Sequence, residues 1–482
     1  MKIALNFFLY SFLCFNLCSA QSVENPSFDS LKVIEPTLLK QDFVAFKDAL
    51  LKTHPSLYRF QTQKRFNELF ENYYNSINTN TSQIDFLARI KFLLSCIEDG
   101  HIYCGVSPYL KKYFDERTNV FPITLKFIND KAFVICSKEK TLTPETEIVS
   151  INDVPIIKIR KKLFQYIVSD GAIETKKNWV LSNNFWFYYR LVYGQQSVFK
   201  IDYNYKGRAV KTISVVAEKF INTQCEKDYQ KQERLLQLSY QNKNTALLKI
   251  KTFNGDLLDN SKENYSQFLQ STFTCLNEKK IETLIIDLRG NGGGIDDYGK
   301  LLYSYLTDKE FQYYTSLETS TQKLTKNNIN NFPKIENPSE DNFKGRNNIS
   351  TQKPSVNNFK GNVFVLIDGL SFSTTAEFCA IAKSNKRAKF IGEETGGGYF
   401  GNTSGNAVEV ILPNTNILID IPTTKYVLAV KKDKHDDRGI IPDFEITPTI
   451  EDYILQKDIQ LDFALQLINK NNLQKKNNNK KE

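Results

Sequence analysis

A chain of 482 residues with 41% hydrophobic and 13% aromatic residues is too rich in apolar side chains to be intrinsically disordered, and it is long enough for two or three domains. Its formal net charge of +9 lies partly in a Lys/Asn-rich end, where the stretch from Lys470 to Glu482 holds five Lys and one Glu. We interpret this basic excess as a solvated tail, and we therefore expect no nucleic-acid partner.

Residues 1–20 are typical of a secretory signal peptide. Lys2 supplies a positive charge, an apolar run extends from Ile3 to Leu17, and Cys18-Ser19-Ala20 forms a small-residue cleavage site. The apolar run is shorter than the roughly 20 residues that a membrane span needs. We therefore predict an exported protein of the periplasm, the cell envelope or the medium, with no integral membrane span in its mature chain.

Residues 21–115 are predicted to form a helical N-terminal cap. Within 38–98, three stretches place apolar residues three and four positions apart, as amphipathic helices do. The last of them ends at Asp99-Gly100-His101. Histidine is well suited to proton transfer near neutral pH, although a lone histidine in a loop is more often structural. The other two histidines are His54, which precedes a proline at a helix end and is interpreted as structural, and His435.

Residues 116–217 change to short apolar runs separated by Asn-Asp and Lys-Gly turns, which predicts a small β-rich domain with one helix near 158–169. The segment from Glu145 to Pro155 is similar to the turn-strand-turn of a PDZ domain. Glu145 stands where PDZ domains commonly have a glycine. We therefore predict a PDZ-like domain in which a peptide-binding groove is in doubt.

Residues 240–450 alternate strand and helix patterns, which indicates an α/β domain. The polar stretch 318–360 is predicted to be a surface insertion over or beside the functional site. Residues 451–482 are expected to form a terminal helix followed by the Lys/Asn-rich tail.

The apolar strand that ends near Leu288 leads directly into four glycines. A strand feeding such a loop can direct several backbone N–H groups at one anion or developing oxyanion. A tight turn without any ligand explains a glycine run equally well. The spacing excludes a dinucleotide-binding GxGxxG motif, and no Gly-Lys-Ser/Thr follows to make a phosphate-binding P-loop. The glycines are Gly290, Gly292, Gly293 and Gly294.

A second apolar strand, 363–368, is followed by Ser373 and Thr374 at the start of a predicted helix. Serine and threonine at this position are ordinary helix N-caps. The functional alternative is a nucleophilic hydroxyl at a strand-to-helix turn, where the helix N-terminus stabilises an oxyanion.

Taken together, these motifs resemble the tail-specific or C-terminal processing peptidases. The stretches IIDLRGNGGG, VFVLIDGLSFSTTAEFCAIA and RAKFIGEETGGG occur in the family's order, with DGH at 99–101 and RGIIPDFEI at 438–446. The resemblance covers roughly residues 38–470. It implies an α/β chain with a crotonase/Clp-like β-β-α catalytic domain, and hydrolysis of peptide bonds through an acyl-enzyme with no metal or organic cofactor.

The resemblance also implies which residue is the base. The Ser/Lys branch of the family has a lysine at the position of Gly398, and no lysine occurs here between Lys389 and Lys425. The tricorn-core-like branch uses a histidine near the cap boundary, and His101 matches that position. That branch has a serine immediately before its histidine, where this chain has Gly100.

Two residues match the nucleophile. The usual family spacing, a serine three residues before a glutamate, selects Thr374, whereas matching the T-x-S pattern selects Ser373. We favour Ser373 because its primary hydroxyl is less hindered, with Thr374 as the alternative. The resemblance gives Asp436 the role of orienting the histidine, with Asp437 as the alternative.

The N–H groups of Gly292, Gly293 and Thr374 are expected to bind the oxyanion. The sequence thus predicts an exported serine endopeptidase that acts on proteins or peptides. A non-catalytic peptide- or ligand-binding protein on the same scaffold is the alternative, and a hydrolase of non-peptide esters or amides is a third possibility.

Overall fold

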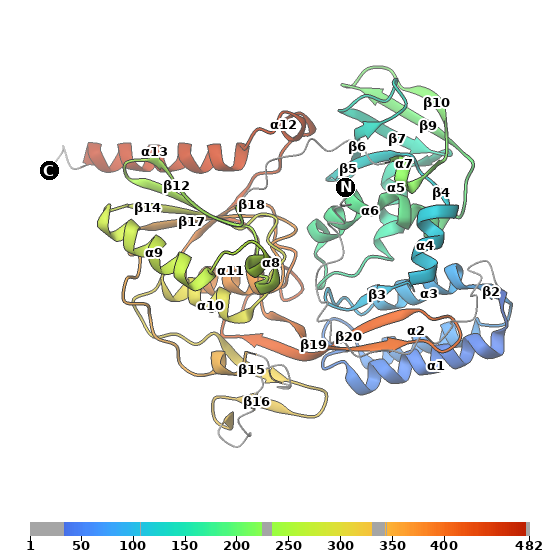
Figure 1. Ribbon diagram of the computed structural model, residues 1–482, viewed down its shortest axis with the longest axis horizontal. Helices are drawn as coiled ribbons and strands as arrows, with labels where there is room; N and C mark the ends of the chain where they lie inside the picture. The colour runs from blue at the N-terminus through green and yellow to red at the C-terminus, as the bar shows by residue number, and fades with distance from the viewer. Residues whose placement is uncertain (1–32, 107, 224–233, 330–342, 344, 479–482) are drawn as a thin grey trace.

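The computed structural model describes residues 33–106, 108–223, 234–329, 343 and 345–478. The predicted signal peptide lies outside the described residues. Figure 1 shows a catalytic region with the C-terminus on one side, and the cap and the β-rich domain on the other. A long hairpin joins the two sides.

The cap is helical, as expected for residues that repeat apolar side chains every three to four positions. Thr62 and Ser82 start two of its helices by accepting hydrogen bonds from Arg65 N and Asp85 N. The helices bury an aromatic core that includes Phe46. The cap consists of β1 (Val33–Ile34), α1 (Pro36–Thr53), α2 (Gln63–Asn75), β2 (Thr81–Ser82), α3 (Gln83–Ser95), β3 (Tyr103–Gly105) and α4 (Pro108–Arg117).

The β-rich domain contains a six-stranded sheet in the order β10-β9-β7-β6-β5, with β8 paired to β7. Its assignment as PDZ-like stays a prediction. Glu145 has a φ of 71°, a left-handed conformation that favours glycine, and its carboxylate pairs with Lys206 at 2.8 Å. The strands are β5 (Ile123–Ile128), β6 (Lys131–Ser137), β7 (Thr146–Ile151), β8 (Val154–Pro155), β9 (Val198–Tyr205) and β10 (Lys211–Val216), while β4 (Asn119–Val120) pairs with β11 (Glu218–Lys219).

Two helices lie in this domain where one was predicted. The first, α5 (Ile156–Phe164), covers the predicted position and is followed by Gln165 as its C-cap. The second, α6 (Glu174–Tyr193), was not predicted, because its asparagines and clustered aromatic residues give no clear helical stripe. A short helix, α7 (Phe220–Thr223), follows.

The catalytic domain has a six-stranded sheet in the order β12-β13-β14-β17-β18-β21. Strand β14 (Thr283–Asp287) is buried along its whole length, as its continuous apolar run predicts. Its Ile286 belongs to the main core, whereas Ile285 packs in a second cluster with Ala464 of α13. The sheet is therefore covered by helices on both faces (Figure 1).

All neighbouring pairs in this sheet are parallel except β12 with β13, which is antiparallel. The elements are β12 (Leu236–Asn242), β13 (Thr245–Ile250), α8 (Gly255–Asn260), α9 (Tyr265–Glu278), β14, α10 (Asp296–Ser304), β17 (Asn362–Ile367), α11 (Thr374–Ser384), β18 (Lys389–Gly392), β21 (Phe444–Glu445), α12 (Ile450–Ile454) and α13 (Ile459–Asn478).

A second sheet of five strands contains the hairpin that reaches the cap. Strands β19 (Gly401–Ile411) and β20 (Leu418–Leu428) extend from the catalytic domain across to α1, and β3 pairs with β20 (Figure 1). The remaining strands are β15 (Tyr314–Glu318) and β16 (Lys323–Thr325).

The described part of the predicted insertion 318–360 is not purely a surface loop. It contains β16 and the 3-10 helix η2 (Arg346–Ile349), and Leu324, Phe343 and Ile349 are buried in the main core. These few apolar side chains anchor the polar stretch to the domain.

No helix among the described residues is both long enough and apolar enough to cross a membrane.

Candidate active site

Ser373 lies at the turn between β17 and α11 in a strained conformation. Its φ is 55° and its ψ is −130°, and its side chain makes no capping hydrogen bond within the described helix. A positive φ is uncommon for a residue with a side chain, and such strain is concentrated at functional sites. Ser373 is also half-buried rather than enclosed. The turn therefore presents this hydroxyl instead of using it as an N-cap.

Thr374 is placed differently. It is fully buried, and its hydroxyl donates a hydrogen bond to the Gly294 carbonyl at 3.0 Å. This hydroxyl is thus committed to holding the glycine loop, and the geometry favours Ser373 over Thr374 as nucleophile.

The glycine loop packs directly against Ser373. A Cβ atom on Gly293 would lie 2.7 Å from the Ser373 Cβ and 2.8 Å from the Phe372 carbonyl oxygen, so only glycine fits at this contact. The Gly293 N–H donates a hydrogen bond to Asn291 Oδ1 at 3.0 Å, so this N–H group already has one acceptor within the loop. Gly292 is exposed and faces open space.

Asp368 joins the glycine loop to the nucleophile turn. Its carboxylate accepts hydrogen bonds from the N–H groups of Gly290 at 3.0 Å, Leu370 at 3.0 Å and Ser371 at 3.1 Å. Burial raises the pKa of this carboxyl, while the backbone N–H groups oppose the shift. The clamp fixes the two loops that would surround a substrate carbonyl.

His101 reaches this turn from the cap. Its ring stacks on Phe372, the residue before Ser373, with 4.3 Å between centroids and 26° between planes. Both ring nitrogens are buried and have no hydrogen-bond partner among the residues that the structure describes. The structure thus places the His101 ring against the residue that precedes Ser373, although the two residues are far apart in the sequence.

Two carboxylates lie beside this imidazole. Polar atoms of Asp99, His101 and Asp170 all lie within 4.8 Å of one another. Asp99 accepts a hydrogen bond from the backbone N–H of His101 at 2.8 Å and another from His54 Nε2 at 2.9 Å. Asp170 accepts the Gly100 N–H at 2.7 Å. Because both carboxylates already accept hydrogen bonds from protein groups, we interpret the cluster as the support of the histidine and not as a metal site.

His54 has the structural position that its sequence context indicated. Its Nδ1 accepts the Ser56 N–H at 3.1 Å, so its Nε2 carries the proton that Asp99 accepts. Burial raises the pKa of Asp99, but the hydrogen bonds from His54 and from the backbone N–H of His101 outweigh burial and hold that pKa below its usual value. Asp99 is therefore ionised at neutral pH.

The acids predicted to orient the histidine lie elsewhere. Asp436 is exposed, and Asp437 contributes its backbone carbonyl to a 2.9 Å hydrogen bond with Ala172 N. Neither is among the charged groups, within the described ranges, that shift the pKa of His101. The structure places Asp99 and Asp170 there instead. Asp99 could have been found from the sequence, because it belongs to the DGH motif that contains His101. Asp170 follows a short helix and lies in no motif, so the sequence did not indicate it.

Helix α11 carries a further buried acid in its first turn, Glu377. Glu377 accepts hydrogen bonds from the Tyr314 hydroxyl at 2.7 Å and from Asn402 Nδ2 at 2.8 Å. Burial, reinforced by the charge of Asp296, raises the pKa of Glu377 to about 8. Glu377 is therefore mostly protonated at neutral pH.

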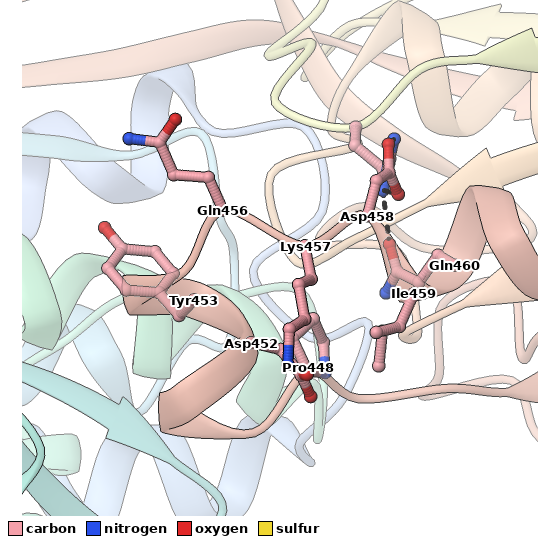
Figure 2. A pocket seen from close by; sticks show the side chains of 9 residues that line it. Pro448, Asp452, Tyr453, Gln456, Lys457, Asp458, Ile459 and Gln460 are labelled. Atoms are coloured by element: carbon pink, nitrogen blue, oxygen red, sulfur yellow. Dashed lines mark hydrogen bonds and ion pairs between the residues drawn. The ribbon is translucent and has the colours of Figure 1, made fainter.

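A pocket of about 310 Å³ lies behind the glycine loop, where Arg289 meets α12 and the start of α13 (Figure 2). Arg289 is already held by Asp287 at 2.7 Å and by Asp458 at 2.7 Å. Of the described residues that line the pocket, none is a candidate catalytic residue. The candidate catalytic residues therefore lie at the Ser373 turn and not at this pocket.

Comparison with known proteins agrees with this geometry. Residues 244–446 match the model of peptidase family S41. No curated protein sequence matches the chain. Mature CPAF complexed with lactacystin has a similar structure, with a TM-score of 0.61 and 13% identity over 90% of this chain and 98% of that chain. Mature CPAF alone gives a TM-score of 0.59 and 13% identity over 87% of this chain and 94% of that chain.

A putative peptidase from Parabacteroides merdae has 14% identity over 90% of this chain and 96% of its own, with a TM-score of 0.47. At these identities the likeness to the solved structures shows the fold alone. Residues 244–446 therefore form a peptidase family S41 domain, which supports the expected resemblance to the tail-specific and C-terminal processing peptidases.

Proposed function

We propose that this protein is an exported serine endopeptidase that hydrolyses peptide bonds of proteins or peptides, with Ser373 as nucleophile and His101 as base. One observation carries the proposal. Phe372 stacks on the His101 ring, and the next residue is a strained, half-buried serine pressed against the glycine loop. Membership of a peptidase family supports a protein or peptide substrate.

In the first half-reaction, His101 would take the proton of the Ser373 hydroxyl as its oxygen attacks the scissile carbonyl carbon. The C–N bond then breaks, and His101 returns the proton to the leaving amine. A water molecule hydrolyses the acyl-enzyme by the same steps. Rotation of the imidazole past Phe372 would bring a ring nitrogen to the hydroxyl, since catalytic hydrogen bonds often tighten only with substrate bound.

The oxyanion would be stabilised by backbone N–H groups at the same turn. Gly292 is open to solvent, and the Thr374 N–H is the first of helix α11, whose N-terminus favours negative charge. The partly engaged Gly293 N–H is the third candidate. The imidazolium that forms during attack would be stabilised by Asp99 and Asp170.

The test compares Ser373→Ala with Thr374→Ala. Labelling by a fluorophosphonate probe and cleavage of an unfolded protein such as casein are measured for both variants. We expect Ser373→Ala to lose both signals. Thr374→Ala should keep the label at a reduced rate, because it loses the hydrogen bond to the Gly294 carbonyl but keeps the Ser373 hydroxyl. Retention of both activities in Ser373→Ala would refute the assignment.

A non-catalytic binding protein is the second candidate. The unpartnered nitrogens of His101 favour it, because they show that the Ser373–His101 hydrogen bond is not formed among the described residues. This function predicts calorimetric binding of an unstructured peptide without any fluorophosphonate labelling. An ester hydrolase would be labelled but would cleave only non-peptide substrates.

Export is a separate proposal that rests on the signal-peptide pattern of residues 1–20. Cell fractionation and N-terminal sequencing of the mature protein test it. We expect a protein outside the cytoplasm that starts at Gln21. An intact Met1 in the cytoplasmic fraction would refute it.

A further inference from the structure

Lys176 of α6 is a buried cation in contact with the candidate active site. The side chain comes from the β-rich domain, and the residue is 9% exposed. Its Nζ donates a hydrogen bond to the Gly100 carbonyl at 2.8 Å and lies 3.2 Å from the centroid of the Phe372 ring. One ammonium group thus contacts the residue before His101 and the residue before Ser373.

The contact also explains why residue 100 is a glycine. A Cβ atom on Gly100 would lie 2.8 Å from Asp170 Oδ1, 2.9 Å from Lys176 Nζ and 3.1 Å from the Phe372 ring. A serine at this position would therefore clash with the lysine and the aspartate. The space next to His101 is filled by a cation and an anion that the β-rich domain provides.

The charges around His101 come from three segments of the chain. Asp99 lies two residues before it, Asp170 and Lys176 come from the segment around the start of α6, and Arg59 comes from the loop after α1. Gly398, from the glycine segment before β19, donates its N–H to Asp170 Oδ2 at 3.2 Å. Asp99 is paired with His54, so Lys176 and Arg59 are the cations that face the histidine and Asp170.

We infer that Lys176 is a positioning residue for the proposed hydrolysis: its ammonium fixes the Gly100 carbonyl beside His101, and its charge keeps the imidazole neutral and able to accept a proton. The inference rests on the proposed function. It adds a residue from the β-rich domain to the site, so the orientation of that domain affects the chemistry.

The electrostatic shifts agree with this geometry. Burial makes the largest contribution to the lowered pKa of His101. Asp170 and Asp99 raise that pKa, while Lys176 and Arg59 lower it. Burial also lowers the pKa of Lys176 itself to about 8, so the lysine is still mostly charged at neutral pH. Without the lysine, only Arg59 would oppose the upward effect of the two aspartates on the pKa of His101, so that pKa would rise.

The experiment is the pH profile of kcat/KM for cleavage of an unfolded protein, measured for the wild type, Lys176→Met and Lys176→Arg. Lys177→Met is the matched control, because Lys177 is the next residue of α6 and contacts the Phe164 carbonyl instead. We expect the acid limb of Lys176→Met to move to higher pH by about one unit, which is about a tenfold loss at pH values below the wild-type limb and little loss near pH 9. Lys176→Arg should restore the wild-type limb.

A loss of the same factor at every pH in Lys176→Met would show a structural role only and would overturn the inference. An unshifted profile would overturn it too. If Lys176→Met does not fold, Lys176→Gln replaces it, and failure of both to fold would also overturn it in favour of a structural role. Failure of the proposed function is distinguishable, because the wild type itself would then carry no fluorophosphonate label on Ser373.

Discussion

The hairpin between β19 and β20 is held to the cap by one buried carboxylate, and its removal should loosen the histidine loop. Asp42 of α1 is fully buried and accepts four hydrogen bonds from the hairpin turn. The donors are Asn414 N at 2.9 Å, Asn414 Nδ2 at 2.8 Å, Thr415 N at 2.8 Å and Thr415 Oγ1 at 2.6 Å. Strand β20 then pairs with β3, where Ile419 lies opposite Cys104, shortly after His101.

The expected magnitude follows from these bonds. A hydrogen bond to a charged group contributes about 1.5–3 kcal/mol, and breaking a buried charged network by removing one partner costs about 3–5 kcal/mol, because contributions within one network do not add. Asp42→Ala should therefore lower the free energy of local opening of the hairpin by about 3–5 kcal/mol. Since about 1.4 kcal/mol corresponds to tenfold, amide exchange should accelerate by roughly two to nearly four powers of ten.

Hydrogen exchange followed by mass spectrometry measures this directly on peptides that cover 412–420 and 101–106. Asp48→Ala is the control, because Asp48 lies on the same helix but is exposed. We expect faster exchange in both peptides and a lower kcat/KM in Asp42→Ala alone. Unchanged exchange at 412–420 would refute the clamp. Faster exchange there with unchanged exchange at 101–106 would refute the coupling to His101.

Three further variants test other parts of the account. Burial raises the pKa of Glu377 from its ordinary value of 4.5 to about 8 in the folded protein. The stability contributed by its protonated form is therefore fully present below pH 4.5 and is lost as the pH rises through 8. Urea unfolding should therefore show Glu377→Gln gaining stability over the wild type by up to about 4 kcal/mol between pH 5 and 9, and a constant difference would contradict this. Gly293→Ala places its Cβ 2.7 Å from the Ser373 Cβ and should reduce kcat/KM at least ~100-fold. Gly290→Ala is the control and should reduce kcat/KM far less, because Gly290 has a similar positive φ but a Cβ there meets no atom within 4 Å. Equal losses of kcat/KM in the two variants would argue against the contact. His54→Phe should destabilise the fold by about 1–3 kcal/mol, because it removes one buried donor from the Asp99 carboxylate. His435→Phe, at an exposed position, should not destabilise it; equal unfolding midpoints would contradict this.

Much of the catalytic domain could be predicted from local patterns. The apolar run of β14 is buried on both faces, and the glycines after it lie against the serine turn. These features depend on short-range patterns of apolar residues and on backbone conformations that few residue types adopt, so they can be predicted from the sequence.

The charged surroundings of His101 could not be predicted in the same way. Lys176 and Asp170 belong to a segment with no recognisable motif, and lysine is usually exposed. Lys176 is buried because glycines let α6 approach the site. A Cβ on Gly396 would lie 3.2 Å from the Lys176 Cβ, and one on Gly369 would lie 2.5 Å from the Thr175 carbonyl oxygen. Such contacts arise from tertiary packing between segments that are distant in the sequence.

The acid partner illustrates the same limit. The family resemblance selects Asp436, which lies just before the stretch RGIIPDFEI, yet Asp436 is exposed to solvent. The carboxylates that reach the imidazole come from the DGH loop and from the start of α6. Spacing along the chain indicates which segment contains Asp436, but it does not indicate where the Asp436 side chain points.

The most direct test of the central claim is the rate and position of fluorophosphonate modification in the wild type and in His101→Asn. If Ser373 is activated by His101, peptide mapping should find the adduct on Ser373, and its rate of formation should fall by about a thousandfold in His101→Asn. An adduct elsewhere, or an equal rate in the two proteins, would contradict the account.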